Sequence, residues 1–324
     1  MLNQQGDLVR ATATNLLLTL ASLAFIGTVP LRAQNFPTIK VETNLIDTTF
    51  SVRDPSGQLV HGLSKNNFTV TEDGVPQTIR FFFHDTQLPL SIGLIIDASG
   101  SQDKFIKEHE KDIAAFLHQV LEPNDQAFAV CFGNHLRMVS DYTASVPTIL
   151  SGIHQFNKGA RNFPELGPKE ERDLGTALND AVYYSVTEKL AGIHQRRKAI
   201  IVFSDGEENS SEHDLLDSIE AAQNADVLVY AIRYTELHSA QMSARDRYGV
   251  RVLDHITTET GGRSFDAQSN LKQAFSEIAD DLRSLYDLAY QSTNSVRDGA
   301  YRKIVIRTTQ PGLTVRARTG YYAK

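Results

Sequence analysis

Three separated segments of the chain carry oxygen-bearing side chains of the kind that bind hard cations. The first holds Asp97, Ser99 and Ser101, the second holds Thr176, and the third holds Asp205. Together they offer carboxylates and hydroxyls, with no His or Cys among them. Mg²⁺, Mn²⁺ and Ca²⁺ prefer oxygen ligands, whereas zinc and copper favour nitrogen and sulfur. The residue types therefore predict a site for a hard divalent cation.

The predicted ligand set would leave such a cation electrophilic. Hydroxyl ligands are neutral, and carboxylates held partly through water neutralise the ion less than direct carboxylate ligands do. Mg²⁺ dehydrates reluctantly and keeps several waters, which suits a shallow and incomplete protein cage. An open coordination position could then accept a carboxylate from a partner protein.

Two buried strands are expected to position these segments. Residues 90–97 (LSIGLIID) and 198–204 (KAIIVFS) are nearly continuous apolar runs, which is typical of strands covered on both faces of a parallel sheet. Segments with helical periodicity alternate with further strands, and this alternation predicts an α/β fold with a doubly wound, mostly parallel sheet. Loops that leave the carboxyl ends of such strands gather along one edge, so the three segments should converge.

The remaining elements of the α/β part follow from the same periodicities. Helices are expected over 105–121, 146–156, 174–193, 215–225, 252–260 and 271–285, and strands over 125–132, 135–140 and 227–232, with a short edge strand at Phe265. A polar loop over 157–173 is unusually long, which indicates a functional rim.

Short strands precede and follow this α/β part. Residues 34–88 are expected to form an N-terminal β module, and residues 286–324 add strands over 286–291, 303–308 and 314–322. Because each set is partial, we expect the two sets to pair in space as one small β-sandwich, interrupted by the α/β domain of residues 89–285. Two independent appendages are the alternative.

Two local features of the N-terminal β module are also predicted. The alternation of apolar residues over 40–52 slips at Leu45-Ile46, which indicates a bulge. The segment Glu72-Asp73-Gly74 predicts a hairpin turn, with residues 79–83 as the returning strand.

The candidate ligands resemble a known family pattern. Asp97, Ser99 and Ser101 match Asp-x-Ser-x-Ser, Thr176 matches its distant Thr, and Asp205 matches its Asp before Gly. This set is similar to the metal-ion-dependent adhesion site (MIDAS) of the von Willebrand factor type A domain, and the resemblance covers about residues 90–285. It implies that the two Ser and usually the Thr touch the metal, while the two Asp act largely through water. The flanking β segments are similar to those of bacterial exported proteins that carry this domain.

Each of these residues also has a simpler structural interpretation. Ser99 and Ser101 could cap the following helix, and Thr176 could be an N-cap residue. Asp205-Gly206 could be an ordinary turn after a strand. Each simpler interpretation is favoured when a residue is taken alone, but their joint occurrence at one sheet edge in the family's order favours a metal site.

Two acidic residues follow Asp205 closely in the sequence. Glu207 and Glu208 could surround the metal ligands or lie on the rim of the site, although a solvated loop is the favoured interpretation. They also bear on a rival function, a metal-dependent phosphoester hydrolase, in which bound metal orients water. Because no His or Lys accompanies the cluster in sequence, one of these Glu would have to act as the general base.

The N-terminus predicts export. The apolar run over 16–29 is shorter than the about 20 residues that a membrane span needs, but it suits a secretory signal with cleavage after Ala33. We therefore expect residues 1–33 to be a signal peptide and the protein to be periplasmic, cell-surface or secreted. After processing no stable transmembrane span is expected, and an uncleaved membrane anchor is the alternative.

Composition excludes several classes of function. The net charge of −7 argues against a nucleic-acid-binding protein. The single cysteine, Cys131, cannot form an intrachain disulfide or a thiolate metal site and is expected in the core. His109 and His118 lie nine residues apart on the first expected helix and are expected at its surface.

The leading hypothesis is an exported protein-binding module without enzymatic activity, for which no catalytic residue is predicted. A Mg²⁺, Mn²⁺ or Ca²⁺ ion would bind an acidic residue of an unidentified partner protein. A cell-envelope scaffold with a structural metal is a further alternative, beside the hydrolase.

Overall fold

The computed structural model describes residues 45–168, 175–235 and 242–324. The predicted signal segment 1–33 lies outside these residues. Within them, no helix combines the length and the apolar character that crossing a membrane requires.

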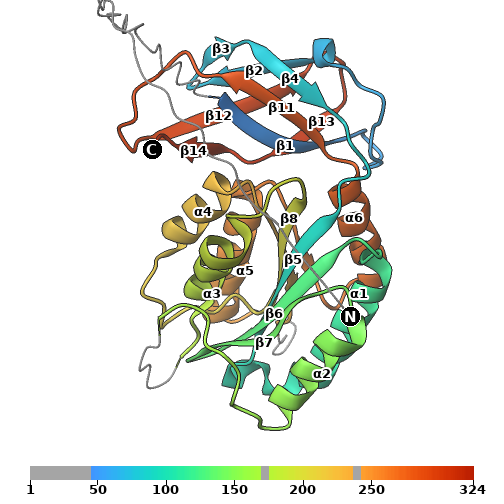
Figure 1. Cartoon of the computed structure of the whole chain (residues 1–324), viewed down its shortest axis with the longest axis vertical. Helices are drawn as coiled ribbons and strands as arrows, with labels where there is room; N and C mark the ends of the chain where they lie inside the picture. The colour runs from blue at the N-terminus through green and yellow to red at the C-terminus, as the bar shows by residue number, and fades with distance from the viewer. Residues whose placement is uncertain (1–44, 169–174, 236–241) are drawn as a thin grey trace, which may run out of the picture. The chain divides into compact units, whose positions relative to one another are not determined.

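A six-stranded sheet forms the centre of the described α/β part (Figure 1). In spatial order its strands are β10 (Ser264–Asp266), β9 (Leu228–Arg233), β8 (Arg197–Ser204), β5 (Leu90–Asp97), β6 (Gln126–Phe132) and β7 (Leu136–Thr143). All neighbouring pairs are parallel except β6 and β7, which form an antiparallel hairpin. The prediction of a doubly wound, mostly parallel sheet is confirmed.

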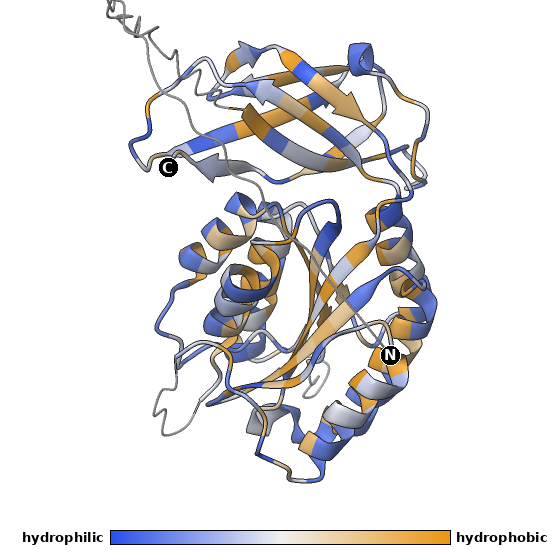
Figure 2. Cartoon of the chain, viewed as in Figure 1, coloured by the Kyte–Doolittle hydropathy of each residue, from blue (hydrophilic) through white to orange (hydrophobic). Residues whose placement is uncertain are grey.

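Helices cover both faces of this sheet, as Figure 1 shows. One face carries α1 (Ile106–Val120), α2 (Val146–Asn157) and α6 (Leu271–Arg283), and the other carries α3 (Leu178–Tyr184), α4 (Leu215–Asn224) and α5 (Ala244–Glu259). Every residue of β5 is buried, and Figure 2 shows apolar residues concentrated in the strands between the two helical layers. The apolar runs therefore form strands because both of their faces are covered.

Two helices differ from their expected limits. The expected helix over 174–193 is α3 followed by a π-helix, η3 (Ser185–Leu190). The helix expected over 252–260 is α5, which begins at Ala244 because the Ser243 side chain accepts a hydrogen bond from the Asp246 N–H and caps it.

The N- and C-terminal strands pair with one another in two antiparallel sheets (Figure 1). The first sheet has the order β13 (Thr314–Ala317), β1 (Leu45–Arg53), β11 (Tyr286–Gln291), β4 (Ile79–Phe83), and the second has the order β14 (Gly320–Tyr322), β12 (Tyr301–Thr308), β2 (Phe68–Glu72), β3 (Val75–Gln77). A short 3-10 turn, η1 (Lys65–Asn67), precedes β2. Phe50, Phe68 and Tyr286 belong to one apolar core between the sheets, so the predicted β-sandwich of N- and C-terminal strands is confirmed.

The predicted bulge at Leu45-Ile46 is wrong. Strand β1 pairs with β11 in continuous register from Leu45 opposite Gln291 to Phe50 opposite Tyr286. Residues 48–52 of this strand are buried on both faces. The outward-facing Thr49 donates its hydroxyl to Asp226 of the α/β part.

Two other strand predictions need correction. The hairpin at Asp73-Gly74 is present, but the strand that returns beside β2 is β3, whereas residues 79–83 pair with β11 in the other sheet. Pro76 has no N–H to donate, which limits β3 to a short edge strand. The segment 314–322 is likewise divided between the two sheets, because β13 pairs with β1 and β14 with β12.

Two sequence expectations for single residues have opposite outcomes. Cys131 is 1% exposed in β6, as expected for a core residue, and burial raises the pKa of its thiol. His109 is only 2% exposed, so its expected surface position is wrong. Its ring lies edge-on against Tyr234, with ring centroids 4.2 Å apart, and burial lowers the pKa of His109 to about 4.

Candidate metal centre

Parallel strand register brings the predicted segments to one sheet edge. Asp97 is the last residue of β5, and Asp205 follows the last residue of β8. Because Ile96 pairs with Phe203, the next residues, Asp97 and Ser204, lie beside each other. The Ser204 hydroxyl donates a hydrogen bond to Asp97 Oδ2 at 2.5 Å. The convergence expected from the sheet therefore occurs in the structure.

Two hydroxyls join the carboxylates at this edge. Ser99 and Ser101 lie at the start of a 3-10 helix, η2 (Gly100–Phe105). Ser101 Oγ donates to Asp205 Oδ2 at 2.7 Å, and Ser99 Oγ lies 3.1 Å from Ser101 Oγ. The Ser99 N–H donates to Asp97 Oδ1 at 2.9 Å. Four of the five predicted residues thus form one connected cluster.

The simpler capping interpretations are wrong. Ser99 occupies the N-cap position of η2, but its side chain makes no capping hydrogen bond. The N-cap residue of α3 is Ala177, so Thr176 lies one residue before that position. Asp205 does form a turn, because its Oδ1 accepts the Glu207 N–H at 2.9 Å, but its other oxygen faces Ser101.

Thr176 reaches the same edge through a neighbour that the sequence analysis did not assign. Its N–H donates to Asn209 Oδ1 at 2.8 Å, and the Asn209 N–H donates back to the Thr176 carbonyl at 3.1 Å. Asn209 lies four residues after Asp205. An Asn in a loop often bonds neighbouring backbone groups, and this tendency is the one sequence signal that could have identified it.

The two carboxylates are buried close to each other. Asp97 is 2% exposed and Asp205 is 5% exposed. Burial, together with the negative charge of Asp205, raises the pKa of Asp97 to about 7. Gln102 Nε2 donates to Asp205 Oδ2 at 2.6 Å, while Gln102 Oε1 is buried without a hydrogen-bond partner among the described residues. The edge therefore holds concentrated negative charge with little water to screen it.

Two other buried carboxylates in this chain form ion pairs with arginine. Asp281 is contacted by Arg53 at 2.5 Å, and Asp125 by Arg283 at 2.5 Å. In the described part of the chain, neither Asp97 nor Asp205 forms an ion pair with a basic side chain. A cation is the group that would balance them, and the surrounding hydroxyls are the oxygen donors that a hard cation accepts. The residues present therefore fit a divalent cation.

The hydroxyls are necessary to this chemistry. Within the described ranges, no group of three or more His, Cys, Asp or Glu side chains could hold a metal ion. A site at this edge would depend on Ser and Thr oxygens, as the sequence pattern predicts.

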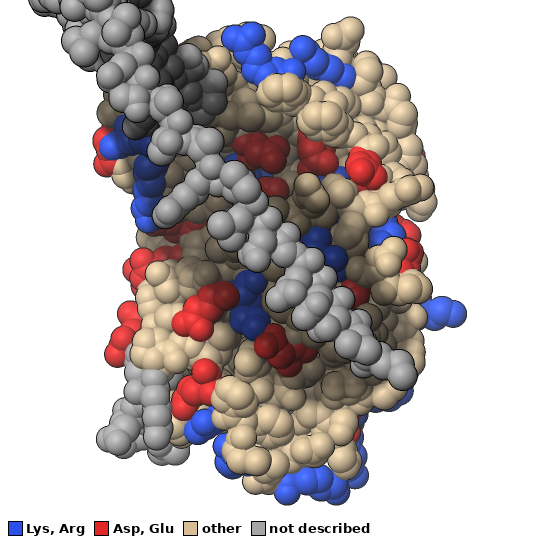
Figure 3. Space-filling model, in the orientation of Figure 1, with Lys and Arg blue, Asp and Glu red and all other residues tan. Residues whose placement is uncertain are grey.

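Figure 3 shows Lys and Arg side chains gathered at the lower end of the face that it draws, which is the end where the strand β5 finishes in Figure 1.

The expected solvation of Glu207 and Glu208 is wrong. Glu207 is 7% exposed and forms an ion pair with Arg245 of α5. Burial and the charge of Asp205 raise the pKa of Glu207. Glu208 accepts backbone N–H groups from its own loop and from α3. Both side chains are therefore held by protein groups rather than by solvent.

Comparison with known proteins identifies the family. A family model for the von Willebrand factor type A domain matches residues 91–267. The chain belongs to this family. Domains of this family are generally metal-dependent modules for protein interaction. The match extends over the central sheet, from the second residue of β5 to just after β10.

Individual relatives are distant from this type A domain protein. An uncharacterised protein of Synechocystis is 27% identical over 134 residues, which cover 40% of this chain and 28% of that relative. The chain thus spans little more than a quarter of the length of this curated relative.

The solved structures that resemble this chain are also distant from it in sequence. The protein BatB from Bacteroides thetaiotaomicron is 17% identical, with 59% of this chain and 98% of that chain covered and a TM-score of 0.44. Proximal thread matrix protein 1 from the mussel byssus, with a zinc-occupied MIDAS motif, is 14% identical, with 65% of this chain and 50% of that chain covered and a TM-score of 0.45.

Proposed function

We propose that the type A domain holds Mg²⁺, or Mn²⁺ or Ca²⁺ in its place, at Asp97, Ser99, Ser101, Thr176 and Asp205. The bound ion would bridge to an acidic side chain of a partner protein. The observation that carries this proposal is the contact of the two Ser hydroxyls with each other and with the Asp205 carboxylate, although neither hydroxyl is used to cap a helix.

The chain's own residues would orient the site before the ion arrives. Asp97 is fixed at one oxygen by the Ser99 N–H and at the other by the Ser204 hydroxyl. Asp205 is fixed by Ser101 and Gln102. When bound, the ion would supply positive charge and an open position for an anionic oxygen. The basic side chains at this end of the molecule favour an acidic partner over a basic one.

The same contacts support a binding role rather than a hydrolytic one. A hydrolase would need Glu207 or Glu208 as a general base. Glu207 is neutralised by Arg245, and Glu208 is occupied by N–H donors. We therefore propose no catalytic residue for this chain.

We further propose an exported protein, with residues 1–33 as its signal peptide. The mature chain would comprise an N-terminal β module over 34–88, the type A domain over 89–285 and C-terminal strands over 286–324. The pairing of β1 with β11 and β13 supports this division, because each terminal set completes the sheets of the other.

Binding of Mn²⁺ to the full chain, measured by electron paramagnetic resonance, tests the site. Asp97→Ala and Ser101→Ala should each raise the Kd for Mn²⁺ by at least about tenfold. The first removes a carboxylate of the site, and the second removes a hydroxyl that also holds the Asp205 carboxylate in place. Asp103→Ala is the matched control, since this exposed carboxylate lies on η2 and outside the cluster. Equal Mn²⁺ affinity in all four proteins would disprove the site.

The partner contact needs a separate measurement. Binding to an immobilised panel of peptides that carry a single Asp or Glu should be lost in EDTA, return with Mg²⁺, and be absent for Asp97→Ala. Binding that survives both EDTA and the substitution would exclude an ion bridge.

A further inference from the structure

The first turn of α3 is capped by a different segment of the chain. Its own N-cap residue, Ala177, makes no side-chain capping bond, so the first N–H groups of the helix need other acceptors. The Asn179 N–H donates to Glu208 Oε2 at 2.8 Å, and the Asp180 N–H donates to Ser211 Oγ at 3.0 Å. Both acceptors belong to the loop that begins with Asp205. The loop and the helix start are therefore joined directly.

Glu208 makes this junction with both carboxylate oxygens. Oε1 accepts the N–H groups of Ser210 and Ser211, each at 2.9 Å. Oε2 accepts the Ser211 hydroxyl at 2.6 Å and the Asn179 N–H at 2.8 Å. One oxygen thus folds the loop, and the other ties it to α3. A Gln at this position would turn an NH₂ group toward hydrogen-bond donors.

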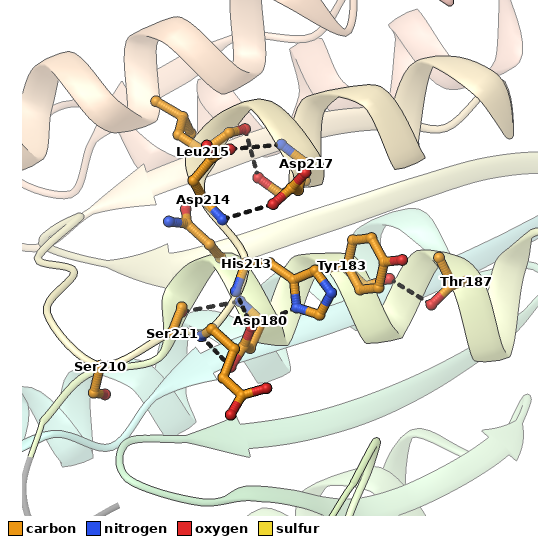
Figure 4. A network of polar contacts seen from close by, with 12 residues as sticks. Asp180, Tyr183, Thr187, Ser210, Ser211, His213, Asp214, Leu215 and Asp217 are labelled. Atoms are coloured by element: carbon orange, nitrogen blue, oxygen red, sulfur yellow. Dashed lines mark hydrogen bonds and ion pairs between the residues drawn. The ribbon is translucent and has the colours of Figure 1, made fainter. Parts of the chain in front are cut away.

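Asp180 makes the reciprocal contact from the helix to the loop. This fully buried carboxylate accepts the His213 N–H at 3.0 Å and His213 Nδ1 at 2.8 Å on one oxygen, and the Glu212 N–H at 3.1 Å on the other. Figure 4 shows the His213 ring between Asp180 and the ring of Tyr183, on which it stacks with centroids 3.7 Å apart. We call Glu208, Ser211, Asp180 and His213 the loop–helix brace.

The brace spans the two segments that carry Thr176 and Asp205. Thr176 lies four residues before Asp180, and Asp205 lies three residues before Glu208. The two hydrogen bonds between Thr176 and Asn209, one to the Asn209 side chain and one between backbone groups, lie between these two ends. We infer that Glu208 and Asp180 are positioning residues, which hold Thr176 and Asp205 at the separation that a shared cation needs. This inference rests on the proposed metal site.

Glu208→Gln in the full chain tests the inference. The exchange of the Asn179, Ser210 and Ser211 amide hydrogens should become about tenfold faster, because the charged acceptor of these three N–H groups is lost. The Kd for Mn²⁺ should rise about tenfold, and the resonance spectrum of bound Mn²⁺ should change. This spectrum reports the ligand geometry and does not respond to a general loss of stability.

Glu212→Gln is the matched control. It removes the same charge from the same loop, but the Glu212 side chain is exposed and only its backbone N–H enters the brace. It should leave exchange, affinity and spectrum unchanged. Ser211→Ala is a milder second variant, which removes one hydroxyl and should shift all three measurements in the same direction by smaller amounts.

The outcomes separate the two proposals. Faster amide hydrogen exchange in Glu208→Gln, with the Kd for Mn²⁺ and the spectrum of bound Mn²⁺ unchanged, would overturn the positioning role. Amide hydrogen exchange that is unchanged in Glu208→Gln would also overturn it. A wild-type chain that binds no Mn²⁺ would overturn the proposed function and the positioning role with it, and its exchange data would still show whether the brace exists.

Discussion

Replacing Asp97 by Asn should stabilise the metal-free chain at pH 8 although it removes a proposed metal ligand. Asp97 is 2% exposed, and burial and the charge of Asp205 raise its pKa to about 7. Above that pH the folded chain carries an ionised carboxylate that has lost its water and has no basic partner among the described residues. Asn has nearly the same shape and no charge.

The magnitude follows from the difference between the folded and unfolded pKa values. Between the ordinary value of 3.8 and about 7 the folded chain holds a proton that the unfolded chain releases, so the free energy of unfolding falls as pH rises through this window. Above about pH 7 the loss is complete, at about 4 kcal/mol. Asn would keep the bond from the Ser99 N–H but weaken the bond from the Ser204 hydroxyl, which costs about 1 kcal/mol.

Urea unfolding at two pH values measures this balance. In EDTA, the free energy of unfolding of Asp97→Asn should exceed that of the wild type by about 3 kcal/mol at pH 8 and by less than about 1 kcal/mol at pH 5. Adding Mn²⁺ at about 100 times its Kd should raise wild-type stability by about 2.7 kcal/mol and leave the variant unchanged. Asp103→Asn, on the exposed side of η2, should behave as the wild type.

Two results would refute the reasoning. The first is a variant that is less stable than the wild type at pH 8 in EDTA, because Asp97 would then be stabilised as an anion. The second is an equal dependence of stability on pH in the two proteins, because the proton that the folded wild type holds would then lie elsewhere.

Two further predictions concern α1 and α5. Burial lowers the pKa of His109 from 6.5 to about 4, so the free energy of unfolding of the wild type should fall by about 3 kcal/mol as the pH drops from above 6.5 to 4. In His109→Leu, urea unfolding should show no such fall from this residue. Equal pH dependence of the free energy of unfolding in the two proteins would contradict the prediction. A Cβ on Gly249 would lie 2.2 Å from the carbonyl oxygen of Asp205, so Gly249→Ala should destabilise the chain by about 1–3 kcal/mol and weaken Mn²⁺ binding; unchanged unfolding and affinity would show that α5 does not limit this loop.

The central sheet and most of the candidate site were predictable because both depend on short-range pattern and general sheet geometry. Apolar runs that form β5 and β8 predict strands buried on both faces, and parallel strands necessarily end at one edge. Asp97 is the last residue of β5, and Asp205 directly follows β8. The sequence therefore predicts that these two residues lie close together, and the prediction needs no knowledge of side-chain contacts.

The roles of the acidic loop residues could not be predicted in this way. A charged side chain in a loop is usually exposed, and the burial of Glu207 depends on Arg245, which is 38 residues away in sequence. Glu208 likewise depends on an N–H of α3, 29 residues before it. Such partners are supplied only by the folded arrangement of α3 and α5. The same limitation explains β1, whose second buried face is covered by residues distant in sequence.

Comparison with another buried carboxylate explains why stability and cation binding should be linked at this edge. Glu72, which is 2% exposed, accepts hydrogen bonds from three hydroxyls, those of Tyr290, Ser292 and Tyr321. Asp97 also relies on neutral donors, the Ser204 hydroxyl and the Ser99 N–H, but the negative charge of Asp205 raises the energy of its anion. An arginine here would relieve that repulsion and would also occupy the place of a cation. The shortage of positive charge that weakens the metal-free fold is thus the source of the proposed affinity, and a substitution that neutralises Asp97 should stabilise the fold and weaken cation binding together.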